Sequence, residues 1–396
     1  MSKHSKISAV TRASESPRFD VKRRLAHLIV ALPLWVGCTA ESNQSSEAGN
    51  NTAAHDGHAH DSTDNHGADH GHGHGEGGME HDEDFGHGDH SPPPLPEDSL
   101  PEKLSETGLY IDISTKEVAD KIIHYVPQYA LWSDGAHKER WALLPDGTKV
   151  DNGDPNNWSV PVGSRFFKEF SIGDQRIETR LIERVGDGPR DFAFVSYLWN
   201  EEQTEAIKVD ASGLPNALGT SHDIPSKQAC LQCHGTYSQG GGRASRMLGF
   251  SLVQLSHADA GISSDELSEH LTEDLPSYSI PGDSTAQDAL GYLHANCGNC
   301  HHDGPDRVPH VELSFWLDAE ATTVEETGTW KTAVNQPNVL FNDQHVVGRI
   351  VPGHPEESSV IYRMQQRGNN AQMPPVATKS IDETGIADVA AWIRSL

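Results

Sequence analysis

The sequence CGNCHH, residues 297–302, contains two cysteines separated by two residues, with a histidine directly after the second. This spacing is typical of covalent attachment of a c-type haem. Two thiols within one helical turn can each add to a vinyl group of the same porphyrin, and the imidazole that follows then lies under the iron as an axial ligand. CLQCH, residues 230–234, repeats the pattern. The sequence therefore predicts two haems, attached through Cys230, Cys233, Cys297 and Cys300 and ligated by His234 and His301.

Cysteine usage supports this interpretation. The chain has five cysteines: four lie in the two motifs, and the fifth, Cys38, ends an apolar run near the N-terminus. The alternatives are a zinc site of four cysteines and a redox-active dithiol. The gap from Cys233 to Cys297 is far longer than a zinc ribbon uses. Neither alternative requires a histidine after both cysteine pairs, so haem attachment is preferred.

The N-terminus has the pattern of an export signal. Three basic residues at positions 22–24 precede an apolar run, residues 25–36, that is too short to span a bilayer as a mature helix. Gly37 and Cys38 follow, and this ending resembles the bacterial lipobox, although Trp35 replaces the usual aliphatic residue. The resemblance implies that residues 1–38 are a lipoprotein-type signal segment with lipidation at Cys38. An ordinary cleaved signal and an uncleaved anchor are the alternatives.

Under each of these interpretations the protein is exported. Export agrees with the predicted haems, because c-type haem is attached outside the bacterial cytoplasm. Thr39 follows Cys38, where an aspartate commonly retains lipoproteins in the inner membrane. We therefore expect a periplasmic or cell-surface lipoprotein held at a membrane by its lipid anchor, with the outer membrane preferred.

Residues 39–100 form a low-complexity segment rich in Gly, Ser, Asn, Asp and His. It has too little apolar surface to offset the entropy of ordering, so we predict a disordered acidic linker. As a flexible chain of about 60 residues it would reach on the order of 45 Å. Its ten histidines can bind Zn, Cu or Ni weakly together with the neighbouring carboxylates. A solvated tether without a metal is the alternative.

Charge restricts the class of partner. The formal net charge is −28 at pH 7. A polyanionic chain repels nucleic acid, so no nucleic-acid partner is expected. The negative charge favours binding of a basic redox partner protein, which the sequence does not identify. The alternative is that the charge only keeps the protein soluble.

The folded part is predicted to begin near Pro101. The alternating runs RFFKEFSI (165–172), RIETRLIERV (176–185) and DFAFVSYLW (191–199) predict half-buried strands separated by turns. A short helix is expected from Ser114 to Ile122. Residues 101–270 are therefore predicted to be a mostly antiparallel β domain that ends in the first haem site.

Residues 271–396 are predicted to be helical around the second haem site. TAQDALGYLHAN (285–296) leads into CGNCHH, NNAQMPP (369–375) is a loop, and DETGIADVAAWIRSL (382–396) closes the chain. This order resembles a class I cytochrome c, and the resemblance implies that Met373 is the distal haem ligand. Pro374 and Pro375 would hold its loop extended. Met364 falls in a helical stretch and is interpreted as core. The predicted fold class is α+β, with an all-α cytochrome c-like domain after the β domain.

The distal position of the first haem stays open. Met247, His222 and His257 are candidate donors, and an open iron is an equal alternative. The order of a β segment running into CLQCH, residues 140–236, resembles lysine-crosslinked c-haem enzymes of nitrogen oxidation. That resemblance makes Lys168 the residue to examine at the first haem. The alternative is that Lys168 is an ordinary surface lysine.

The body as a whole resembles a family of bacterial diheme c-type cytochromes, often lipoproteins, without an assigned physiological reaction. The likeness is carried by LSETGLY (104–110), YALWSDGAHKERW (129–141), VGSRFFKEF (162–170), IPSKQACLQCH (224–234), MLGFSLVQL (247–255), YLHANCGNCH (292–301) and QMPP (372–375). It implies two haems and export, and no substrate. Electron transfer is the preferred function. The alternatives are a haem oxidoreductase with substrate at an open first haem and a His-rich metal-binding or redox-sensing module.

Overall fold

The computed structural model describes residues 99–188, 191–234, 247–303 and 311–396. The chain divides into two compact units, residues 1–85 and 86–396, and every described residue belongs to the second. The signal segment with Cys38, and the His-rich linker except for its last two residues, lie outside the described residues. The predicted boundary between residues 270 and 271 falls inside the second unit and stays a prediction. No described helix is both long and apolar enough to cross a membrane.

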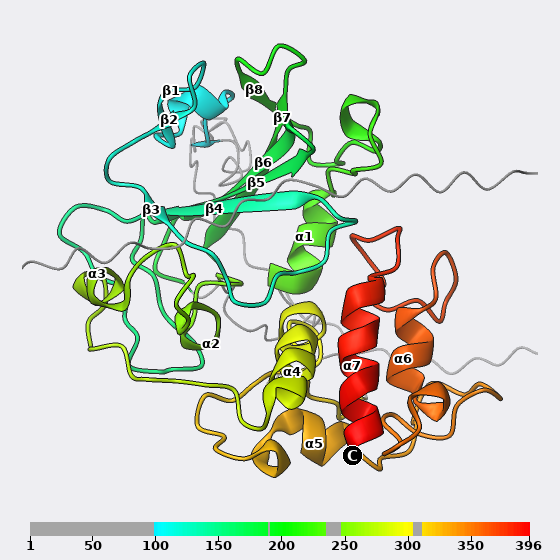
Figure 1. Ribbon diagram of the computed structural model, residues 1–396. Helices are drawn as coiled ribbons and strands as arrows, with labels where there is room; N and C mark the ends of the chain where they lie inside the picture. Colours follow the sequence, from blue (N-terminus) through cyan, green and yellow to red (C-terminus); the bar gives the residue numbers. More distant parts are fainter. Residues whose placement is uncertain (1–98, 189–190, 235–246, 304–310) are drawn as a thin grey trace, which may run out of the picture. The chain divides into compact units, whose positions relative to one another are not determined.

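Six strands form an antiparallel sheet in which each strand pairs with the next along the chain (Figure 1). They are β3 (Ile123–His124), β4 (His137–Leu143), β5 (Arg165–Ile172), β6 (Gln175–Arg184), β7 (Phe192–Trp199) and β8 (Ala206–Lys208). The three predicted strands are confirmed as β5, β6 and β7. Together with the helices, this sheet confirms the α+β class.

Both faces of the sheet are buried over its central strands. Successive side chains of a strand point to opposite faces, and neighbours on β5 accordingly join different hydrophobic clusters. Phe166 packs with Tyr125 and Phe250 on one face, whereas Phe167 packs with Trp199 on the other. The strands therefore read as nearly continuous apolar runs.

The prediction of a helix from Ser114 to Ile122 is wrong. The chain forms instead a two-stranded hairpin of β1 (Tyr110–Asp112) and β2 (Glu117–Val118). The Asp112 carboxylate accepts hydrogen bonds from the backbone and the hydroxyl of Ser114, at 2.8 and 2.6 Å. Such local bonds compete with a helix, and Lys116 takes a left-handed φ of 64° at the turn.

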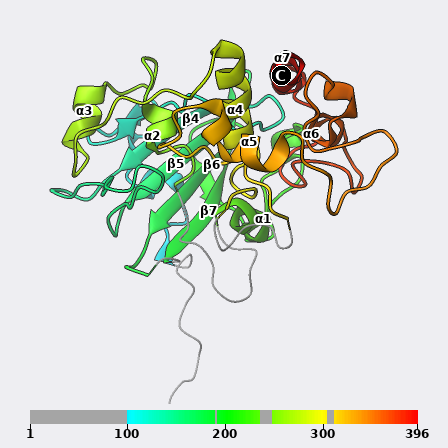
Figure 2. The same cartoon turned by 90° about the horizontal axis from the view of Figure 1, so that it is seen from below.

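Seven α-helices are described, several of them visible from a second side in Figure 2. They are α1 (Lys227–His234), α2 (Leu252–Leu255), α3 (Ser264–Glu269), α4 (Ser284–Asn296), α5 (Gly328–Ala333), α6 (Ser359–Met364) and α7 (Glu383–Ser395). Short 3-10 turns occupy Leu104–Glu106, Ala217–Gly219, Val324–Glu326 and Pro355–Glu357. The predicted helices at 285–296 and 382–396 are confirmed as α4 and α7. Asp283 and Asp382 cap their N-termini by accepting from backbone N–H groups.

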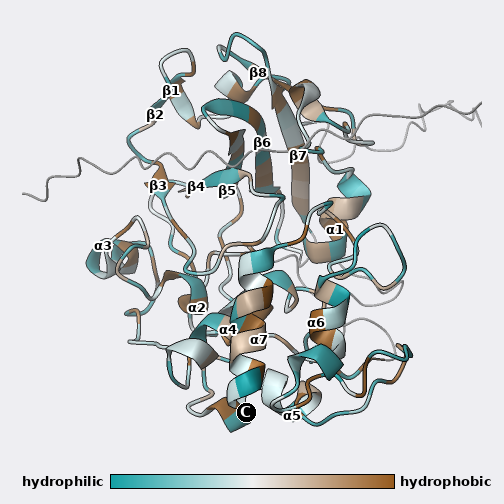
Figure 3. Ribbon diagram, turned by 45° about the vertical axis from the view of Figure 1, so that its right-hand side comes forward, coloured by the Kyte–Doolittle hydropathy of each residue, from teal (hydrophilic) through white to brown (hydrophobic). Residues whose placement is uncertain are grey.

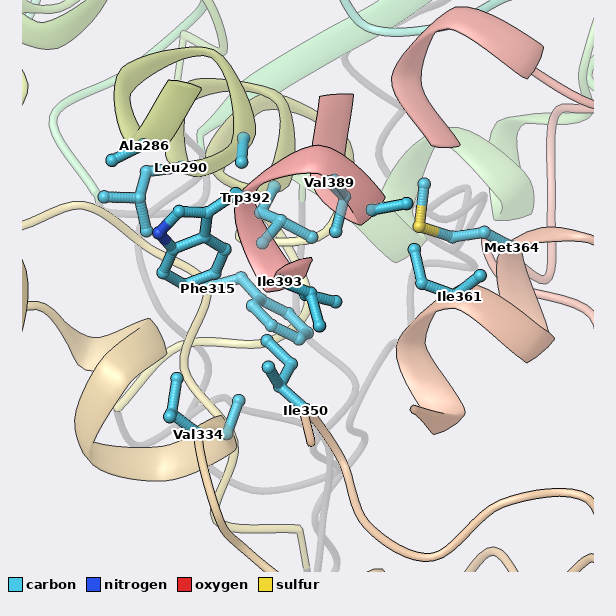
Figure 4. Packing of buried hydrophobic residues seen from close by; sticks show 14 of the residues in the cluster. Ala286, Leu290, Phe315, Val334, Ile350, Ile361, Met364, Val389, Trp392 and Ile393 are labelled. Atoms are coloured by element: carbon cyan, nitrogen blue, oxygen red, sulfur yellow. The ribbon is translucent and has the colours of Figure 1, made fainter. Parts of the chain in front are cut away.

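Helices α4 and α7 pack against each other through one hydrophobic cluster (Figure 4). Leu290 contributes to it from α4, and Val389 and Trp392 contribute from α7. Figure 3 shows hydrophobic and hydrophilic residues interspersed along both helices, as expected of helices with one buried face. Met364 is 4% exposed in the same cluster, which confirms its interpretation as a core residue.

Gly385 allows the close approach of α7 to α4. A Cβ at this position would lie 2.0 Å from the Tyr292 ring. Within a helix, alanine is otherwise favoured over glycine by up to about 1 kcal/mol. We expect Gly385→Ala to lower the free energy of unfolding by about 1–3 kcal/mol because it overpacks this crossing, as measured by chemical denaturation. A variant more stable than the parent would contradict the packing.

Candidate functional site

The first motif lies at the end of α1, beside β7 (Figure 2). Cys230 and Cys233 are three residues apart on this helix, so their side chains point to the same side. The His234 ring lies 5.5 Å from the ring of Phe194 on β7. Burial, assisted by Lys168 and Arg180, lowers the pKa of His234 to about 3. The imidazole is therefore neutral, the form that can bind a metal ion.

A cavity of about 360 Å³ adjoins this motif. Cys230, Cys233 and His234 line it from α1, and side chains of β4 to β7 form the opposite wall. Met247 also lines it and is 8% exposed. Most of the wall is apolar, so the structure offers a space suited to a planar hydrophobic group attached at the first motif.

Basic side chains interrupt the apolar wall. Arg140 on β4 stands directly opposite Lys168 on β5, which stands directly opposite Arg180 on β6. All three line the cavity, so Lys168 lies in the cavity wall and is not an ordinary surface lysine. Burial and the neighbouring Arg140 and Arg180 charges hold the pKa of Lys168 well below its usual range. The sequence alone does not predict this cationic row, because the row depends on the register of β4, β5 and β6.

A buried ion pair supports one member of the row. The Arg180 guanidinium donates two hydrogen bonds to the Glu178 carboxylate, at 2.7 and 2.9 Å. His222 Nε2 lies 2.7 Å from the same carboxylate. Burial alone would raise the pKa of Glu178, but the Arg180 charge and the His222 hydrogen bond lower it to about 2.

The second motif begins where α4 ends. The Cys297 N–H still donates to Leu293 O at 2.9 Å, and the His301 N–H donates to Cys297 O at 2.9 Å, so the motif makes one further turn. His301 Nδ1 is buried and finds no hydrogen-bond partner among the described residues. Burial, assisted by Arg363, lowers the pKa of His301 to about 4. A buried nitrogen without a partner is costly, and this neutral ring is suited to metal ligation.

The two motifs touch each other. Cys300 Sγ lies 3.6 Å from the carbonyl oxygen of Gln232 and donates to it, and the Cys300 thiol is also within hydrogen-bonding contact of Cys233. That contact lowers the pKa of Cys233. Asn299, between the cysteines of the second motif, lines the cavity beside the first. The structure thus brings together two cysteine pairs that lie far apart in the sequence.

The loop that contains Met373 is anchored from two sides. The Met373 N–H donates to Arg363 O at 3.1 Å, and Arg363 is the residue whose charge acts on His301. Further along the loop, the Asp134 carboxylate accepts from the backbone N–H groups of Lys379 and Ser380, at 2.9 and 2.8 Å. Met373 is half-buried. The loop is therefore fixed near the surroundings of the second motif.

Of the candidate distal ligands for the first motif, only Met247 lines the cavity. His222 is bound to Glu178, and His257 Nε2 lies 2.8 Å from the carbonyl oxygen of Val126. The sequence analysis missed His294, which is buried on α4 and does line the cavity. Its Nδ1 accepts from the Leu317 N–H at 3.0 Å, so its proton is on Nε2 and the ring is not arranged as a metal ligand.

Searches with profiles of known protein families, among curated proteins and among solved structures found no match to this chain. The function is therefore argued from the residues of the two motifs and their surroundings.

We expect the Glu178 pair to make stability fall in acid. Because the folded-state pKa of about 2 is below the ordinary value of 4.5, the ionised carboxylate stabilises the fold above about pH 4.5 and this contribution is lost as pH falls through 2. The contribution is on the order of 3 kcal/mol. Glu178→Gln should be less stable at neutral pH and should lose less stability on acidification, as measured by denaturation at several pH values. Parallel pH profiles for the two proteins would contradict this assignment.

Proposed function

We propose that this chain is a c-type cytochrome that carries two covalently bound haems and passes single electrons between them and an external redox protein. The contact between Cys233 and Cys300 carries this proposal. These two sulfurs would each hold a different haem, so the path between the haems runs through side chains that already touch. An arrangement of two unrelated cofactor sites would not require this contact.

The residues present fit such a group at both motifs. Cys230 and Cys233 would hold it at the cavity of about 360 Å³, and neutral His234 would offer a ring nitrogen there. At the second motif, the lowered pKa of His301 keeps its ring neutral, so it would offer a ring nitrogen to the iron. Bound haem supplies one-electron chemistry. The chain supplies attachment, orientation and the exclusion of water.

The surroundings of the second motif support a site for electron transfer. A helix ending in CGNCHH, a methionine loop and a closing helix that packs on the first occur in the order of a class I cytochrome c. Ligation by His301 and Met373 would close both axial positions and raise the reduction potential. Such an iron exchanges electrons without binding a substrate.

A haem oxidoreductase is the second candidate function, and the cavity with Arg140 and Lys168 is the observation that favours it. Substrate would enter only if Met247 leaves the first iron open.

We also propose export, a lipid anchor at Cys38 and attachment to the outer membrane. These parts of the proposal rest on the N-terminal sequence. A metal-binding or redox-sensing role of the His-rich linker rests on residues outside the described part of the chain.

Haem content and magnetic coupling test the electron-transfer proposal. We expect two haems per chain by the pyridine haemochrome assay. In the fully oxidised protein, electron paramagnetic resonance signals should be broadened by the neighbouring iron and should sharpen when one haem is reduced, because low-spin ferrous haem is diamagnetic.

Two variants serve as references for the coupling, Cys230→Ser/Cys233→Ser and Cys297→Ser/Cys300→Ser, each of which keeps one attachment motif. A wild-type spectrum equal to the sum of these two would reject close contact between the haems. Fewer than two haems in the wild type would reject the proposed function itself.

Met373→Ala tests the distal ligand of the second haem. Loss of the thioether should abolish the sulfur-to-iron absorption band and lower the potential of one haem. Met364→Leu is the matched control, because Met364 is buried in the hydrophobic cluster and its replacement should leave the band intact. An unchanged spectrum in Met373→Ala would remove Met373 from the site.

A further inference from the structure

The wall of the first cavity combines an apolar row with a cationic one. On the face that carries Phe166, residues paired across β4 to β7 form successive rows perpendicular to the strands. The first row consists of Ala142, Phe166, Ile182 and Phe194 and is buried or nearly so. The next consists of Arg140, Lys168, Arg180 and Ser196. Three basic side chains are therefore in register on the same face as this hydrophobic row.

This row is unfavourable by itself. Like charges directly opposite each other on neighbouring strands destabilise a sheet, and burial of a charge without a counter-charge costs more. Glu178 compensates Arg180. Arg140 and Lys168 have no ion-pair partner among the described residues, although Arg140 is only 6% exposed. Lys138 lies in the adjacent row, donates to Leu131 O and adds further positive charge.

The row faces the first attachment motif. Arg140, Lys168 and Arg180 line the same cavity as Cys230, Cys233 and His234. Guanidinium and ammonium groups bind carboxylates and other oxyanions through charge-assisted hydrogen bonds. A ligand with two anionic groups, held against an apolar surface, would accept hydrogen bonds from Arg140 and Lys168, favour the protonated Lys168 amine, and fit the neighbouring hydrophobic row.

We propose that Arg140, Lys168 and Arg180 form a binding site for anionic oxygen atoms in this cavity. The occupant we expect is the pair of propionate carboxylates of the first haem, so this inference rests on the proposed function. A small free oxyanion such as nitrite or phosphate has the same chemistry and is the second possible source. In either case the anion supplies a counter-charge that Arg140 and Lys168 do not receive from the described residues.

The same side chains would also shift the reduction equilibrium of a haem held at the first motif. Reduction removes one positive charge from the iron site, so a nearby cation favours the reduced form. Lys168→Gln and Arg140→Gln should each make the first haem about tenfold harder to reduce, which is about 59 mV for a one-electron couple. The potential of the second haem should stay unchanged.

Potentiometric titration of the holoprotein tests this, after a haem count has shown two haems in each variant. Lys121→Gln is the matched control, because the Lys121 side chain is 68% exposed and pairs with Asp146 at the surface. Resonance Raman spectra of the same samples report the propionate bending modes, which should shift in Lys168→Gln and Arg140→Gln and not in the control. Wild-type protein is also titrated with nitrite and with phosphate while the Soret band is followed.

A shift of one potential with altered propionate modes identifies the haem carboxylates as the occupant. Saturable binding of nitrite or phosphate that is lost in Lys168→Gln identifies a free oxyanion instead. The inference is overturned if both variants match Lys121→Gln in potential and Raman spectrum and the wild type binds neither anion. If a variant does not fold, the wild-type Raman spectrum decides: propionates free of hydrogen bonds, with no anion binding, reject the site. Fewer than two haems in the wild type would instead reject the proposed function.

Discussion

The contact between the two cysteine motifs is the constraint on which the rest of the structure depends. It requires the end of α1, beside the sheet, to meet the end of α4. The segment before β4 maintains this relation: the Trp132 N–H donates to Asn296 Oδ1 at 2.7 Å, directly before the second motif. Tyr129 of the same segment packs where Gly291 of α4 has no side chain. The segment before β4 thus leads into the sheet and also packs against α4, the helix that leads into the second motif.

Charge is distributed around the first motif in a way that a hydrophobic core alone would not produce. Glu178, Arg180 and His222 form a closed set in which each partner satisfies another. Arg140 and Lys168 stand beside this set without such a partner among the described residues. A buried pair can be neutral in net stability, whereas a buried charge without one is not. An anion in the cavity would therefore favour the charged form of Lys168 and supply a counter-charge to Arg140.

Features local in the sequence were predictable, and features that depend on register were not. The alternation in RFFKEFSI and the apolar stripe of residues 382–396 each depend on neighbours within a few positions, and these elements formed where expected. Haem attachment at CGNCHH stays a prediction. The segment from Ser114 to Ile122 did not form a helix because the Asp112 side chain bonds its own turn. Lys168 was noticed by resemblance, yet its place between Arg140 and Arg180 required the pairing of three strands. The contact of Cys300 with Cys233 required the whole tertiary fold.

The chemistry of the cavity bears on the choice between electron transfer and substrate turnover. Proton abstraction requires a general base close to the reacting group. Among the described residues that line the cavity, the acidic one is Asp210, which is exposed and accepts from the Ser212 N–H at 2.9 Å. Glu178 is already bound by Arg180 and His222, and the lone pair of His294 Nδ1 already accepts from the Leu317 N–H. An anion bound at the row would keep Lys168 in its charged form, so Lys168 would also act as a donor. The donors of Arg140, Lys168 and Arg180 suit the binding of an anion, and without an anion the lowered pKa of Lys168 leaves its amine as a candidate base.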